Sequence, residues 1–232
     1  MKNVVSGLIT ALSLAFIITL PVTSASARKA NTDGGFTEMP FTVEMPPLGA
    51  PVPGVNEPCP CYMAVPRALN EYRSDIEITG FLPVITTEDA AFSARLNGLI
   101  GEKYRGIISR ASGRYARMYV DYRIYEYGGV VSVLLLGGPA KGSAAEHFGG
   151  VSFRCGEGWT YETVTLDGVL GPNGVKIANG IITEAIKGNV NAYHPNFAGI
   201  KSDQDFYVED GTLYVLFDKH YSYAFAVKLF YP

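Results

Sequence analysis

The hydrophobic pattern begins with one long run that contains no charged side chain. Residues 4–20 (VVSGLITALSLAFIITL) follow Lys2 and precede the small residues 25–27 (ASA). A positive start, an apolar stretch and a small-residue cleavage site are the three parts of a secretory signal peptide. We therefore expect cleavage after Ala27 and export of the remaining chain. An uncleaved anchor is the alternative, because about 17 apolar residues are the lower limit for spanning a bilayer.

Residues 28–58 show no periodic pattern. They include six prolines and four glycines: Pro40, Pro46, Pro47, Pro51, Pro53, Pro58, Gly34, Gly35, Gly49 and Gly54. Proline lacks a backbone N–H and cannot donate to a strand ladder, so this composition is typical of a spacer. A Pro-rich recognition motif is the alternative, although the basic flanks of such motifs are missing. We expect a signal peptide at 1–27, a linker at 28–58 and a domain at 59–232, which could divide into halves at 59–150 and 151–232.

The pattern after the linker first has a period of two and then a helical period. Residues 75–85 alternate apolar and polar side chains, which predicts a strand, and Pro83 places it at a sheet edge. Apolar residues then recur every three or four positions over 88–111, which predicts an amphipathic helix. Thr86 and Asp89 are expected to form its capping box, and Gly113 to end it. The apolar stripe consists of Phe92, Leu96, Leu99, Ile100, Tyr104, Ile107 and Ile108.

The remaining residues alternate between strand and turn signals, with one further helix. Residues 116–127 have a period of two, and a Gly128-Gly129 turn joins them to the apolar run 130–136, which predicts a hairpin with a central second strand. Further expected elements are strands at 147–155 and 159–166, a helix from Pro172, a hairpin of 206–208 and 213–217 around Asp210-Gly211, and a strand at 221–230. This order predicts an α+β fold, an antiparallel sheet with two main helices packed on it.

Composition excludes several classes of protein. The chain has 232 residues, of which 47% are hydrophobic and 18% charged, with a formal net charge of −3. A disordered tail would be less hydrophobic, and a nucleic-acid-binding protein would carry a basic surface. We therefore expect a folded domain whose partner is not nucleic acid.

The three cysteines, Cys59, Cys61 and Cys155, fit an exported chain. An oxidising compartment allows a disulfide, and we expect a bridge from Cys61, or from Cys59, to Cys155. Three free thiols are the alternative. One residue between Cys59 and Cys61 is too few for the two-residue redox motif or for paired zinc ligands, so no metal or cofactor is expected.

The strand predicted near residues 117–127 carries the most prominent polar and aromatic face. Tyr119, Asp121, Arg123 and Tyr125 should point to one side. Aromatic side chains with an arginine are typical of a surface that binds protein or sugar. The alternative is that a helix covers this face.

No catalytic motif is complete. Residues 136–143 (LGGPAKGS) follow a strand, but Lys precedes Gly where a phosphate-binding loop needs Gly-Lys-Ser/Thr. Glycines at 168, 171 and 174 lack the dinucleotide-binding spacing. Asp203, Asp205, Glu209 and Asp210 are candidate hydrolytic carboxylates or calcium ligands, with a solvated turn as the alternative.

Four segments together resemble a known secreted domain: 81–85 (FLPVI), 94–100 (ARLNGLI), 122–136 and 206–217 (FYVEDGTLYVLF). That domain is the extracellular lysozyme sensor of an anti-sigma factor in Gram-positive bacteria, and it precedes the catalytic domain of some peptidoglycan deacetylases. The tail is also similar, through Phe206, Tyr207, Phe217 and Tyr221. Residues 137–140 (GGPA) depart from the family's Gly-Gly-Ala-His turn.

The resemblance implies an α+β domain with helices on one side of an antiparallel sheet and a non-enzymatic role at the cell envelope. We expect an exported binding module for an extracellular or periplasmic protein or glycan, either a lysozyme-like protein or peptidoglycan, with Tyr221 among its contacts. A secreted hydrolase acting on cell-wall material and a structural envelope component are the alternatives. No stable membrane span is expected once the signal peptide is cleaved.

Overall fold

The computed structural model describes residues 61–73, 75–156, 160–171, 173–187, 199–216 and 224–228. The predicted signal peptide at 1–27 and the linker at 28–58 lie outside these residues. Within the part of the chain that is described, no helix is both long enough and apolar enough to cross a membrane.

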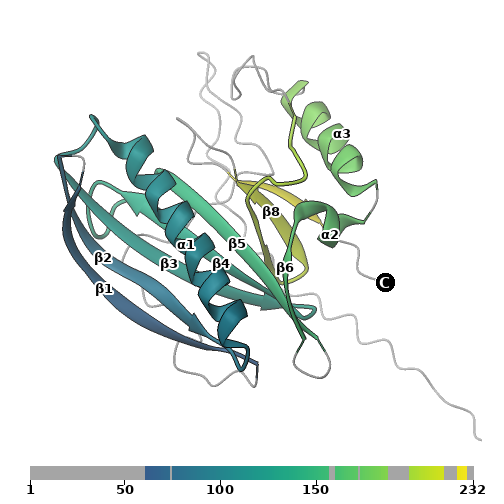
Figure 1. Cartoon of the computed structure of the whole chain (residues 1–232). Helices are drawn as coiled ribbons and strands as arrows, with labels where there is room; N and C mark the ends of the chain where they lie inside the picture. Colours follow the sequence, from purple (N-terminus) through teal and green to yellow (C-terminus); the bar gives the residue numbers. More distant parts are fainter. Residues whose placement is uncertain are drawn as a thin grey trace, which may run out of the picture. The chain divides into compact units, whose positions relative to one another are not determined.

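Six strands form the main sheet, in the spatial order in which they follow one another along the chain. They are β1 (Met63–Arg73), β2 (Ile76–Thr86), β3 (Arg117–Tyr127), β4 (Val130–Gly138), β5 (His147–Gly156) and β6 (Thr160–Val164). Neighbouring strands are antiparallel except β2 and β3, which run parallel. The sheet is therefore mixed, and the prediction of a purely antiparallel sheet is wrong. The helix between β2 and β3 crosses one face of the sheet (Figure 1), and such a crossover returns the chain in a parallel direction.

The long predicted helix is α1 (Ala90–Ala111). Its predicted stripe faces the sheet, and the buried members include Phe92, Leu96 and Ile107. Asp89 is the N-cap, and its side chain accepts a hydrogen bond from Phe92 N at 2.9 Å. The predicted capping box with Thr86 is wrong, because Thr86 is the last residue of β2.

Strand β2 is an interior strand, so the edge position predicted from Pro83 is wrong. Its parallel pairing with β3 runs only from Glu77 to Gly80, whereas its pairing with β1 continues to Thr86. Pro83 therefore lies beyond the part of β2 that pairs with β3. There the amide of Asn97, on α1, bonds the backbone of Ile85, donating to its carbonyl at 2.7 Å and accepting from its N–H at 2.9 Å.

Strand β4 is buried along its whole length, as its apolar run predicts. Val131, Val133 and Leu135 pack in the core beneath α1, whereas Leu134 and Leu136 pack in a second cluster with Tyr207 and Leu216. Because successive side chains of a strand point to opposite faces, β4 is covered on both.

A second, three-stranded antiparallel sheet covers the other face. Its strands are β7 (Phe206–Glu209), β8 (Thr212–Leu216) and β9 (Ala224–Lys228), in the order β7-β8-β9. Strand β7 packs on β3, β4 and β5. The predicted turn at Asp210-Gly211 is confirmed, with φ values of +46° and +76°. Because β7 packs on the face of the main sheet opposite α1, both faces of that sheet contribute buried side chains.

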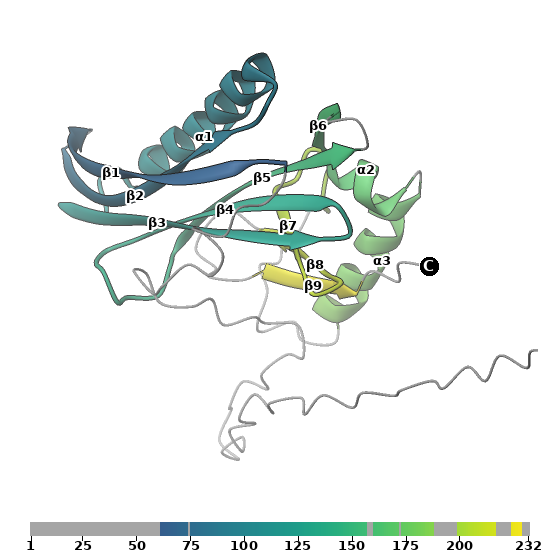
Figure 2. The same ribbon diagram turned by 90° about the horizontal axis from the view of Figure 1, so that it is seen from below.

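Two further helices, α2 (Leu166–Leu170) and α3 (Gly174–Lys187), follow β6 and pack on each other. Figure 2 shows α3 beside the small sheet, where it contacts β9. The α+β class is confirmed, but only α1 of the two predicted main helices packs on the main sheet. The short helix α2 was not predicted, and its N-cap Thr165 accepts from Gly168 N.

Candidate functional site

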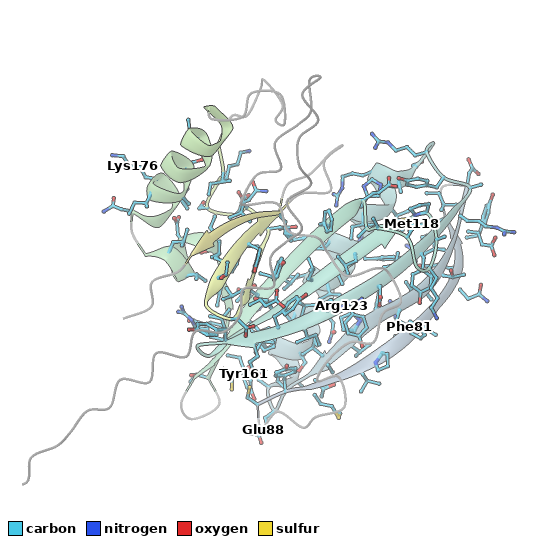
Figure 3. The ribbon with its side chains drawn as sticks, turned by 180° about the vertical axis from the view of Figure 1, so that it is seen from behind. Phe81, Glu88, Met118, Arg123, Tyr161 and Lys176 are labelled. Carbon is cyan, nitrogen blue, oxygen red and sulfur yellow. The ribbon has the colours of Figure 1, made fainter. Side chains whose placement is uncertain are left out.

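The predicted binding face on β3 is buried. Tyr119, Asp121 and Arg123 are 9%, 4% and 2% exposed, and Tyr125 is partly buried. The prediction that these residues form an exposed surface is wrong, because β7 of the second sheet packs over them. The alternating pattern correctly places these side chains on one face of β3. The small sheet covers that face, whereas the alternative interpretation expected a helix to cover it. Figure 3 shows Arg123 on the main sheet close to the strands of the small one.

Asp121 and Arg123 form a buried ion pair between the two sheets. Arg123 Nη1 lies 2.9 Å from Asp121 Oδ2 and also donates to the carbonyl of Tyr122 at 2.6 Å. The other carboxylate oxygen of Asp121 accepts from Tyr122 N at 2.9 Å. A buried charge needs such compensation, so this pair fixes the β3 backbone at the position where the small sheet docks.

Three tyrosines stack beside this ion pair. The ring centroids of Tyr125 and Tyr207 are 4.9 Å apart, and those of Tyr207 and Tyr214 are 4.5 Å apart. Burial, with a smaller effect of the Glu209 charge, raises the pKa of Tyr125 to about 12, and burial also raises the pKa of Tyr207. The stack is part of the packing between the sheets, so it does not offer a binding surface. Tyr221, the fifth predicted binding residue, lies outside the described residues.

A polar pocket opens where α1 meets β5 and the segment before β7. Its volume is about 360 Å³. The helix contributes Lys103, Gly106 and Arg110, which share one helical face because they are three and four positions apart. The remaining lining residues are Glu102, Phe148, Lys201, Asp203, Gln204, Asp205 and Leu216.

One wall of the pocket is fixed by Asp205. Its carboxylate lies 2.5 Å from Lys103 Nζ and also accepts from Gly150 N at 3.1 Å. Its backbone carbonyl accepts from Leu216 N at 2.8 Å. Asp205 thus ties α1, β5 and β8 together, and its charge is balanced by Lys103.

Arg110 and two glycines shape the contact between α1 and β5 beside the pocket. Arg110 Nη2 donates to the carbonyl of Phe148 at 2.9 Å. A Cβ atom on Gly106 would lie 3.0 Å from Arg110 Nη1, so the glycine leaves the space that the guanidinium occupies. A Cβ atom on Gly149 would lie 3.0 Å from Lys103 Cβ, so a second glycine lets α1 approach β5 closely.

The four acidic residues considered as hydrolytic or calcium-binding do not form one site. Asp203 and Asp205 line the pocket, whereas Glu209 and Asp210 belong to the β7–β8 hairpin. Burial and the nearby Asp210 raise the pKa of Glu209. In the described segments, no group of three or more His, Cys, Asp or Glu side chains is arranged to hold a metal ion.

No local signal in the sequence marks the pocket. The spacing of Lys103, Gly106 and Arg110 was present in the helical pattern, but nothing local indicates that these residues meet a segment about 100 positions later. Only Asp203 and Asp205 were named as candidates.

The two described cysteines of the predicted bridge both lie near Tyr161. Tyr161 Oη donates to the carbonyl of Cys61 at 3.0 Å, and Cys155 is the cross-strand partner of Tyr161. No bond joins Cys61 to Cys155 in the structure, where Cys155 is a free thiol. Because both cysteines lie near the same side chain, the bridge remains a prediction for the oxidised protein.

Neither a scan against protein-family models nor a search of curated proteins finds a match to this chain. The resemblance to the lysozyme-sensing domain therefore stays a prediction.

Proposed function

We propose that this chain is an exported, non-enzymatic binding domain of the cell envelope and that its ligand is peptidoglycan. The observation that supports the proposal is the open pocket beside α1, which is lined by positive and negative side chains. Pockets of about 300–1,000 Å³ are typical of small-ligand sites, whose polar groups set specificity. Export rests on the apolar run at 4–20 with its cleavage pattern.

The charges in the pocket favour a ligand that is itself polar. Peptidoglycan combines sugar hydroxyls and amides with peptides that carry carboxylates and amines, so it matches a wall of mixed sign. A lysozyme-like protein is the weaker candidate, because a stable protein interface covers about 800 Å² on each partner. Of the aromatic residues expected to provide it, Tyr119 is buried and Tyr125 is partly buried.

A hydrolytic role for the acidic residues is less well supported. Asp205 is committed to Lys103 and to the backbone of Gly150, which places its carboxylate in a structural position. A hydrolytic carboxylate would instead have to reach the substrate.

Binding to insoluble peptidoglycan tests the proposal. The chain, expressed from its complete sequence, should co-sediment with purified cell-wall sacculi in a saturable manner at physiological salt, without releasing soluble fragments. Lys201→Ala should weaken the binding, whereas Lys176→Ala, at an exposed lysine on α3, should not. Saturable lysozyme binding by calorimetry together with no binding to sacculi would contradict the proposal.

Export is tested separately by fractionating cells that produce the chain. Recovery of a form shortened by about 27 residues outside the cytoplasm is expected, and recovery of an uncleaved form in the cytoplasm would contradict this part of the proposal.

A further inference from the structure

We infer that the free edge of the main sheet is an interface between two copies of this chain. In this pairing, β1 lies antiparallel to β1 of the second copy, about a two-fold axis at Leu69. The inference goes beyond the proposed function and is independent of it, because no residue of β1 lines the pocket.

The edge formed by β1 is long and accessible. Among the described residues, β1 has β2 as its sheet neighbour and no strand on its other side. Figure 1 shows it at the outer margin of the main sheet. On one face α1 packs mainly on β5, and on the other the small sheet packs on β3, β4 and β5. Both layers thus lie mainly away from β1, and an edge of this kind offers its N–H and C=O groups to another strand.

Two facing prolines indicate which backbone groups of β1 point outward. Pro66 is the cross-strand partner of Pro83 on β2. Neither proline carries an N–H, so they cannot exchange hydrogen bonds and must be a non-hydrogen-bonded pair of the antiparallel ladder. Every second residue after Pro66 therefore directs its N–H and C=O groups away from β2. These residues are Ala68, Asn70 and Tyr72, and all three are exposed.

The charges on β1 favour one register for a second copy. Its charged side chains are Arg67, Glu71 and Arg73. With Leu69 opposite Leu69, each Arg67 lies opposite Glu71 of the other copy. Facing residues of opposite charge stabilise a strand pair, and like charges destabilise it. A pair centred on Asn70 would instead place Arg67 opposite Arg73, so charge complementarity selects the register centred on Leu69.

The same register matches the outward backbone groups. Ala68 lies opposite Asn70 of the second copy, and because both are outward residues they exchange both of their hydrogen bonds. Tyr72 lies opposite Pro66, whose carbonyl accepts from the Tyr72 N–H although proline offers no donor in return. A two-fold axis repeats each contact, so the interface is self-complementary and closes at two copies.

Exposed hydrophobic side chains also lie at this edge. Met63 and Val65 on β1 are exposed, as are Phe81 and Val84 on β2. In the proposed register Val65 lies opposite Arg73, whose aliphatic stem can cover it. Proteins that remain monomeric usually keep such an edge short or covered, so its length and apolar content favour a second copy as the cover.

Sedimentation of the full-length chain over a concentration series tests the inference. The unmodified chain should pass reversibly from the mass of one chain to that of two. Asn70→Pro removes an outward N–H and no bond to β2, and should weaken the association at least about a hundredfold. Asn70→Ala keeps that N–H and is the matched control, so it should associate as the unmodified chain does.

Two results of this experiment would overturn the inference. One is an unmodified chain that stays monomeric up to about 0.1 mM, well above a micromolar Kd. The other is an Asn70→Pro chain that is folded by circular dichroism and associates as tightly as Asn70→Ala. Should Asn70→Pro not fold, the charge variants below decide.

Charge variants test the register. Arg67→Glu and Glu71→Arg, each alone, bring like charges together across the two-fold axis and should weaken association at least about tenfold. An equimolar mixture of the two variants should form a mixed dimer, because every facing pair then joins opposite charges. A mixture that associates no better than either variant alone would overturn the inference.

Hydrogen exchange distinguishes a second copy from a segment of the same chain. Protection of the Ala68 amide should rise with protein concentration and be lost in Asn70→Pro. Protection that does not depend on concentration would mean that another part of the chain, such as residues 28–58, covers the edge, and the inference would be wrong. Loss of binding to sacculi in a chain that still dimerises would contradict the proposed function alone.

Discussion

Gly80 lies where β2 stops pairing with β3, and its φ is +123°. A Cβ atom there would lie 1.9 Å from the backbone oxygen of Val120. Both the dihedral angle and the close approach of β3 therefore require glycine. Gly98 on α1 has an ordinary helical setting, with no atom within 4 Å of its missing Cβ.

These two glycines give a matched prediction. Gly80→Ala should lower the free energy of unfolding by several kcal/mol or prevent folding, because β2 and β3 must separate. Gly98→Ala should instead raise it by about 0.5–1 kcal/mol, since alanine favours a helix. Urea unfolding followed by circular dichroism measures both. Equal effects of the two substitutions would show that the strand contact at Val120 is not as described.

Tyrosine burial predicts how stability depends on alkaline pH. The ordinary pKa of tyrosine is 10.0, and burial raises that of Tyr125 in the folded chain to about 12. Above pH 10 the unfolded chain loses this proton while the folded chain retains it, so the contribution of Tyr125, complete below pH 10, is lost as the pH rises to about 12.

Tyr125→Phe should therefore reduce the fall in stability between pH 10 and 12. Tyr72→Phe, at a side chain that is 70% exposed, should leave the fall as it is. Unfolding curves at several pH values measure this fall in the free energy of unfolding. The burial of the tyrosine stack would be contradicted if both variants followed the unmodified chain.

At the scale of elements, two helix asparagines bond the backbone of neighbouring segments. Asn97 bonds both backbone groups of Ile85, and Asn179 on α3 bonds both backbone groups of Ile200, at 2.7 Å and 3.1 Å. An amide can do this because it carries a donor and an acceptor side by side. Asn97 thus attaches α1 to the part of β2 that does not pair with β3, and Asn179 attaches α3 to a segment that lies outside any strand.

Removing one such amide leaves partly buried backbone groups without their hydrogen-bond partner. Asn97→Ala should lower the free energy of unfolding by about 1–3 kcal/mol, and hydrogen exchange at Ile85 should become faster. Asn70→Ala, at an exposed position of β1, is the control and should be close to neutral. Unchanged exchange at Ile85 would contradict the role given to Asn97.

The elements that depend on local signals could be predicted from the sequence. The stripe of α1, the glycine turn after β3 and the Asp210-Gly211 turn lie within a few residues of the pattern that specifies them. The parallel pairing of β2 with β3 and the docking of β7 depend on contacts between distant segments. For that reason Arg123 was placed on the correct face of its strand but was expected to be exposed.

The pocket could not be predicted for the same reason. Lys103 and Asp205 are 102 positions apart in the chain, and Gly106 and Gly149 have no motif that marks them. The sequence indicates Asp203 and Asp205 as polar candidates but does not indicate which residues they contact.

At the scale of the whole molecule, the two sheets share a cluster of buried side chains. Val208 N donates to Ser132 Oγ at 3.2 Å, and Ser132 Oγ lies 3.1 Å from Ser152 Oγ. A Cβ atom on Gly150 would lie 2.7 Å from the carbonyl oxygen of Phe206, so the backbones of β5 and β7 are in direct contact. We therefore expect the sheets to unfold together.

Breaking the ion pair between the sheets tests this expectation. Asp121→Ala leaves the Arg123 charge buried and should lower the free energy of unfolding by about 3–5 kcal/mol in a single transition. Glu77→Ala removes the partner of Arg117 in an exposed pair and should have little effect. Two separate transitions for Asp121→Ala would mean that the small sheet is an independent unit.

The most direct test of the central claim, that the pocket beside α1 is the ligand site, is amide chemical-shift mapping of the isotopically labelled chain with soluble peptidoglycan fragments. The account predicts concentration-dependent shifts at Gly106, Phe148 and Gly150 and in residues 201–205, with little change across β1. Saturable binding whose shifts leave these residues unaffected would contradict it.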